Sequence, residues 1–136
     1  MEITNQQLRK HLPNRFYTKA INLIYRIKGS KIDSSVIIYK KAQLLRYLRN
    51  ISIKKNAIVK SGAQICACNK TAEIFIGENT TIGFYTFIYS SSKISIGNNC
   101  MIAPFVYIVD SDHEKKIHQN INTQPNKTTP IKISND

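Results

Sequence analysis

The sequence contains no tryptophan, only five glycines and four prolines, and only three cysteines. Cys66, Cys68 and Cys100 are too few for a disulfide framework. A C-x-C pair with one distant partner is also a poor zinc pattern, because a second close pair is missing. We therefore expect the cysteines to be small side chains that line strands, and we predict no metal site.

Long apolar runs are also lacking. No run approaches the roughly 18 residues of a membrane-spanning helix. The N-terminus, MEITNQQLRK, lacks the apolar core of a signal peptide. At 136 residues the chain is long enough for one domain with a modest core. We expect a cytoplasmic protein, and peripheral contact with the inner membrane stays open.

Negative charge is scarce in the first part of the chain. Residues 1–60 contain 14 lysines and arginines against two acidic residues, whereas residues 61–136 contain six of each. This asymmetry indicates that the N-terminal part faces something anionic, such as a membrane surface, a phosphorylated ligand or nucleic acid. A solvated basic face is the commoner cause of such a bias. Because no recognition motif accompanies the charge, we expect no nucleic-acid partner.

Residues 1–30 read as an N-terminal helical segment. A short helix, Leu8 to Leu12, is expected to end before Pro13, and Asn14 is a plausible N-cap for a second helix that stops at Gly29. The second helix has an apolar stripe formed by Tyr17, Ala20, Ile21, Ile24 and Ile27. Two interpretations stay open: the stripe packs on its own domain or a neighbouring subunit, or the basic helix rests on anionic lipid.

From Lys31 onwards, a large aliphatic residue recurs every six positions. A period of six fits neither a helix nor a two-faced strand, but it fits a coil with flat sides of six residues. The repeat falls into four sets of three, separated by short phase slips: Ile32, Ile38, Leu44; Ile53, Val59, Ile65; Ile76, Ile82, Ile88; and Ile96, Ile102, Ile108. We predict that all twelve side chains point into the coil.

The position four residues after each large residue is usually occupied by a small one. Nine of these twelve positions hold Ala, Ser, Thr, Cys or Val. The exceptions, Leu48, Asn69 and Asp112, each close a set of three, where we expect the chain to leave the coil. Large and small inward residues alternating in this way suit a tight triangular cross-section.

A longer repeat supports the same grouping. The anchors Ile32, Ile53, Ile76, Ile96 and Ile133 are separated by 21, 23, 20 and 37 residues. Such periods are typical of solenoids. We therefore predict an all-β fold: a parallel β-helix over residues 31–136, preceded by the helical segment 1–30. The long interval predicts an extruded polar loop at about 110–130, and such loops often carry function.

The final residues open another rung from Ile131, and no further rung follows Asp136. Because a solenoid normally ends in a capping element, we expect a natural truncation or a fragment.

Several motifs resemble one known family. The hexads, Ile96-Gly97-Asn98-Asn99, Ala103-Pro104 and the exit Asp110-Ser111-Asp112-His113 are similar to the hexapeptide-repeat acyltransferases. The resemblance covers about residues 31–136 and is closest to sugar O-acetyltransferases of the maltose and galactoside type and of capsule or lipopolysaccharide synthesis. It implies a left-handed β-helix, a homotrimer with active sites between subunits, acetyl-CoA as donor and a sugar or glycan acceptor.

The same resemblance implies residue roles. His113 would be the catalytic general base that takes a proton from a sugar hydroxyl, a task for which imidazole is suited near neutral pH. Tyr85, Asp110 and Asp112 are the expected substrate-binding residues, although relatives often have Asn at the position of Tyr85. Either carboxylate could instead orient the imidazole or simply lie at the surface. His118 is expected to be a solvated loop residue. The alternative function is a truncated, inactive β-helix scaffold, because in relatives the rungs that follow build most of the CoA channel.

Overall fold

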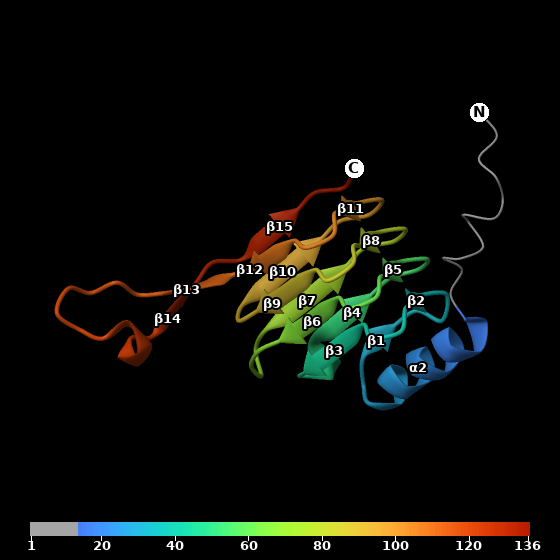
Figure 1. The fold of residues 1–136 in the computed structure, drawn as a ribbon, viewed down its shortest axis with the longest axis horizontal. Helices are drawn as coiled ribbons and strands as arrows, with labels where there is room; N and C mark the ends of the chain where they lie inside the picture. The colour runs from blue at the N-terminus through green and yellow to red at the C-terminus, as the bar shows by residue number, and fades with distance from the viewer. Residues whose placement is uncertain (1–13) are drawn as a thin grey trace.

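A computed structural model describes residues 14–136 and shows a parallel β-solenoid of about four turns, with one helix at its N-terminal end (Figure 1). The predicted all-β fold with a parallel β-helix is therefore confirmed. The expected short helix from Leu8 to Leu12 lies outside the described residues.

Each turn adds one short strand to each of three parallel sheets. Sheet A stacks β1 (Lys31–Ile32), β4 (Ile51–Ile53), β7 (Glu73–Ile76), β10 (Lys93–Ile96) and β15 (Ile131–Ile133). Sheet B stacks β2 (Ile37–Ile38), β5 (Ile58–Val59), β8 (Thr81–Ile82) and β11 (Met101–Ile102). Sheet C stacks β3 (Gln43–Arg46), β6 (Gln64–Ala67), β9 (Phe87–Ser90) and β12 (Tyr107–Val109).

Outside these sheets, the described residues form a helix, two 3₁₀ turns and a two-stranded hairpin. The helix α2 (Arg15–Ile27) precedes β1, and a short 3₁₀ turn, η1 (Leu48–Asn50), joins β3 to β4. An antiparallel hairpin of β13 (Ser111–His113) and β14 (Asn126–Thr128) projects from the solenoid after β12 (Figure 1). A second 3₁₀ turn, η2 (Ile121–Thr123), lies within the hairpin.

The interior is built from the predicted hexad positions. Ten of the twelve large residues are buried, and the two in the last turn, Ile102 and Ile108, are half-buried and pack against the core. The anchors pair in register from turn to turn, so that Ile32, Ile53, Ile76, Ile96 and Ile133 form one column in sheet A. Seven of the small positions are also buried: Val36, Ala42, Ala57, Ala63, Thr80, Thr86 and Cys100. The predicted inward orientation is confirmed.

Two of the three corners pass through a residue with positive φ. At the corner between sheets A and B these are Asn56, Asn79 and Asn99, with φ of 57°, 55° and 59°. Their side chains form a ladder, since Asn56 Nδ2 donates to Asn79 Oδ1 (3.3 Å) and Asn79 Nδ2 donates to Asn99 Oδ1 (3.1 Å). Asparagine tolerates this backbone region better than most residues, so the ladder joins three turns with little strain.

The helix begins as predicted at Asn14, whose Oδ1 accepts hydrogen bonds from the amides of Phe16 and Tyr17. It ends before Gly29, which has a φ of 102°. In the predicted apolar stripe, Ile21 packs against the core, whereas Ile24 and Ile27 are exposed. The face that packs on the solenoid therefore shares Ile21 with the predicted stripe but leaves Ile24 and Ile27 outside it. Within residues 14–136, no helix combines the length and the apolarity needed to cross a membrane.

Candidate functional site

The sequence-predicted loop is the hairpin β13–β14, which carries His113 near its base. Ser111 pairs with Thr128, Asp112 with Lys127 and His113 with Asn126. The chain leaves the solenoid after β12 and returns to it at β15, so the excursion fills the long interval between the last two anchors of sheet A. Antiparallel pairing gives this segment a defined shape that a polar loop of its composition need not have.

Asp110 fixes the base of the hairpin. Its side chain is 4% exposed and accepts three hydrogen bonds: from Ser90 Oγ (2.7 Å), from the Ser91 amide (2.6 Å) and from the Ser92 amide (2.9 Å). The Asp110 carbonyl also accepts a bond from the Thr129 amide, at the returning end of the hairpin. Contact between the Asp110 carboxylate and a substrate would have to compete with these three donors.

Asp112 and His113 follow Asp110 by two and three residues, on β13, and both are exposed. The Asp112 carboxylate accepts a hydrogen bond from the backbone amide of His113 (2.8 Å), and it lies 3.9 Å from Lys115 Nζ. Asp112 thus contacts the backbone of His113 and not its imidazole. The His113 ring is open to solvent, where an incoming molecule can reach it.

Gln124 orders the outer part of the hairpin, and sequence reasoning missed it. The side chain is buried; its Oε1 accepts from the Lys116 amide (2.7 Å), and its Nε2 donates to the carbonyls of Lys116 (3.2 Å) and Gln119 (3.0 Å). No sequence signal distinguishes such a glutamine from an ordinary surface one. His118, in the segment that Gln124 closes, is exposed as expected.

Tyr85 lies at a different corner from His113. It stands between β8 and β9, at the corner joining sheets B and C, and it has a positive φ of 52°. Its ring stacks on that of Phe105, with centroids 5.6 Å apart and planes 9° from parallel. The ring also covers Gly62, where an added Cβ would come within 2.4 Å of it. In a single chain, therefore, Tyr85 and His113 do not share a site.

The outer face of sheet A carries a groove that sequence reasoning also missed. It has a volume of about 390 Å³, and its lining includes four cations, Lys31, Arg49, Lys54 and Lys93. Glu73 also lines it and pairs with Lys93 (3.2 Å), while Lys54 Nζ lies 5.5 Å from the centroid of the Phe75 ring. The middle residues of three Ile-x-Ile repeats, Ser52, Phe75 and Ser95, line the groove, but none of the four cations occupies such a position, so the repeat gave no sign of its charge. The groove suits an anionic group, but His113 is not part of its lining.

The cysteines are free thiols, as expected from their number. Cys66 and Cys100 are buried, whereas Cys68 is partly exposed. Within residues 14–136, no group of three or more His, Cys, Asp or Glu side chains is arranged to hold a metal ion.

We found no significant match to the chain among protein-family models, curated proteins or solved structures. The class of the protein rests on its own structure: it is a parallel β-solenoid with an N-terminal helix and an extruded hairpin.

Proposed function

We propose that this protein is a cytoplasmic acetyltransferase of the left-handed, hexapeptide-repeat type. Its reaction would move an acetyl group from acetyl-CoA to a sugar hydroxyl of a cell-surface polysaccharide or its precursor. The observation that carries the proposal is the combination of a hexad-built solenoid with a hairpin that presents an exposed histidine, His113, three residues after the buried Asp110.

The chemistry assigns the central role to His113. Its imidazole takes the proton of the acceptor hydroxyl as that oxygen attacks the thioester carbonyl. The carbon–sulfur bond then breaks, and the CoA thiolate receives the proton from the imidazolium. Lys115 is a candidate for contact with the donor phosphates, because its pair with Asp112 is long (3.9 Å) and exposed and hence weak.

A homotrimer would supply what one chain lacks. His113 is exposed, and Tyr85 lies at another corner, so a contribution from Tyr85 requires that the corner of one copy approach the hairpin of the next. Enclosure between copies would also exclude water, which strengthens electrostatic interactions at the reacting atoms.

The test is transfer of isotopically labelled acetyl from acetyl-CoA to a panel of mono- and oligosaccharides, followed by mass spectrometry. His113→Ala should lower the rate by about 10²- to 10⁴-fold, the usual contribution of a general base. His118→Ala is the matched control, because this histidine lies in the same hairpin and should leave the rate unchanged. Equal rates for wild type and His113→Ala would remove His113 from the mechanism.

A second candidate is a non-catalytic scaffold that binds a partner without chemistry. The hydrogen bonds of the two carboxylates favour it, because Asp110 is held by Ser90–Ser92 and Asp112 by a backbone amide, which leaves neither bonded to the imidazole. Calorimetry separates the two candidates. A folded protein that shows no CoA binding at millimolar ligand would support the scaffold, whereas binding would support the acetyltransferase.

A further inference from the structure

A second apolar stripe on α2, different from the one predicted from the sequence, points away from the solenoid. Its residues are Phe16, Ala20, Leu23 and Ile27, spaced by four, three and four positions, so they lie on one side of the helix. Phe16 is 89% exposed and Ile27 is 76% exposed, and Ile24 beside them is also exposed. An exposed apolar run of this length along one side of a helix indicates contact with something apolar.

Polar contacts fix this orientation of the helix. On the opposite side, the buried Asn22 donates from Nδ2 to the carbonyls of Asp33 (3.0 Å) and Val36 (3.2 Å). Tyr25, one turn further on, accepts a hydrogen bond at its hydroxyl from the Leu44 amide (3.1 Å). Rotating the helix to bury the stripe would break these three bonds, so the stripe is held outward.

Cations border the stripe, and the helix contains no acidic residue. At 100° per residue, Arg15, Lys19 and Arg26 fall along one edge of it, between the apolar side and the buried side. Lys28 falls on the other edge, just beyond the end of the helix. All four are exposed. An outward apolar side flanked by lysine and arginine is the pattern of helices that lie in the surface of an anionic bilayer.

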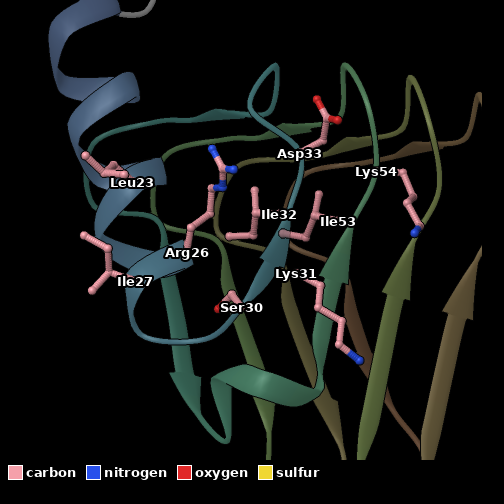
Figure 2. A pocket seen from close by; sticks show the side chains of 9 residues that line it. All are labelled: Leu23, Arg26, Ile27, Ser30, Lys31, Ile32, Asp33, Ile53 and Lys54. Atoms are coloured by element: carbon pink, nitrogen blue, oxygen red, sulfur yellow. The ribbon is translucent and has the colours of Figure 1, made fainter.

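A pocket of about 630 Å³ opens beside the C-terminal end of the helix (Figure 2). Its lining joins the apolar Leu23 and Ile27 of the stripe to three cations, Arg26, Lys31 and Lys54. Figure 2 shows Leu23 and Ile27 on the side of the helix away from the strands, with Arg26 extending over the pocket. Neighbouring cations and apolar side chains match an amphiphile with an anionic headgroup.

One carboxylate, Asp33, also lines this pocket, but it is engaged within the chain. It accepts hydrogen bonds from the Ser35 amide (2.9 Å) and from Ser35 Oγ (2.6 Å). These bonds lower the pKa of Asp33, and the positive charges of Lys55 and Arg26 lower it further. The pocket thus keeps an excess of positive charge, three cations against one carboxylate.

We propose that α2 docks this protein on the surface of an anionic phospholipid bilayer. Phe16, Leu23 and Ile27 enter the region between headgroups and acyl chains, and Arg26, Lys31 and Lys54 bind headgroup phosphates. A second copy is a poorer occupant, because a symmetric contact would bring two acid-free basic helices together. The chain's own residues 1–13 are also poorly matched, since they carry Arg9 and Lys10 against Glu2.

Flotation of the full chain with vesicles tests the proposal. Vesicles of phosphatidylcholine with about one third phosphatidylglycerol should bind the protein at least about tenfold more tightly than phosphatidylcholine alone, and added salt should weaken that binding. The paired change Phe16→Ser and Ile27→Ser should lower binding by at least about tenfold. Ile117→Ser is the matched control, because Ile117 is a similarly exposed isoleucine on the hairpin.

A fluorescent reporter locates the contact. Because the sequence contains no tryptophan, Phe16→Trp introduces a unique probe, whose emission should shift to the blue with the anionic vesicles. Met101→Trp is the control. Met101 is also apolar and highly exposed, but it lies in sheet B, so the emission of this variant should not shift.

Three outcomes would overturn the proposal. They are equal binding to both vesicle types, unchanged binding by the paired variant, and dimerisation lost in that variant without any vesicle binding. The last would assign the stripe to a second copy. Lipid binding is read without acetyl transfer, so this test and that of the proposed reaction can fail independently.

Discussion

At the scale of single residues, two thiols lie side by side on the outer face of sheet C. The Sγ atoms of Cys66 and Cys68 are 3.7 Å apart, at the end of β6. Burial raises the pKa of Cys66 to about 11, with further contributions from the hydrogen bond between the two side chains and from the negative charge that Cys68 carries when ionised. Cys66 therefore stays protonated in the folded chain at a pH where an exposed thiol has ionised.

This difference predicts a loss of stability in alkali. Above the ordinary thiol pKa of 9.0 the unfolded chain releases the Cys66 proton while the folded chain keeps it, so the free energy of unfolding falls as pH rises from 9 towards 11. Urea unfolding at pH 8 and pH 10.5 should show wild type losing about 1–2 kcal/mol more than Cys66→Ala between the two conditions. Parallel losses in the two proteins would contradict the assignment.

Residue types explain why the corners were harder to predict than the core. The hexad rule specifies the large inward residue and the small one four positions later, but it missed the positive φ three positions after the large one. Asn56, Asn79 and Gly62 are types that favour this backbone region. Lys41 and Phe105 adopt it too, with φ of 68° and 58°. These unfavourable types concealed the pattern in the sequence.

At the scale of elements, Asp110 joins the hairpin to the turn below it. Removing its carboxylate leaves the donors of Ser90, Ser91 and Ser92 without their acceptor. We expect Asp110→Ala to lower the free energy of unfolding by about 2–3 kcal/mol, because buried donors would lose a charged partner. We also expect faster trypsin cleavage within the hairpin, at Lys115 or Lys127.

Asp112→Ala is the control for that prediction. Asp112 is exposed and its ion pair with Lys115 is long, so its removal should change stability by less than about 1 kcal/mol. If both variants are cleaved at the wild-type rate, Asp110 does not anchor the hairpin.

The same elements show what patterns of hydrophobicity can predict. The interval of 37 residues between Ile96 and Ile133 located the excursion that became the hairpin, and Asn14 and Gly29 located the ends of α2. The pattern did not predict which face of α2 packs, because Asn22 attaches the helix through hydrogen bonds to strand carbonyls. The pattern also gave no sign that Asp110 is buried, since the motif Asp110-Ser111-Asp112-His113 is equally compatible with an exposed carboxylate.

At the scale of the whole molecule, the solenoid has a gradient of burial along its axis. In the third turn, Ile76, Ile82 and Ile88 are fully buried. In the last turn, Ile102 and Ile108 are only half-buried. Each turn of a solenoid is stabilised by contact with its neighbours, so a turn with a neighbour on both sides gains more than one at an end.

The gradient predicts unequal costs for the same substitution. Ile76→Ala opens a cavity between two turns and should lower the free energy of unfolding by about 3–5 kcal/mol. Ile108→Ala removes a side chain that already meets solvent and should cost about 1–2 kcal/mol. Both variants carry the same Ile→Ala change, so denaturant unfolding compares the two losses of unfolding free energy directly. Amide exchange gives an independent reading, since β7 and β8 should be protected longer than β11 and β12. Equal costs, or equal protection, would mean that the last turn is as well enclosed in solution as the middle ones, against the burial seen here.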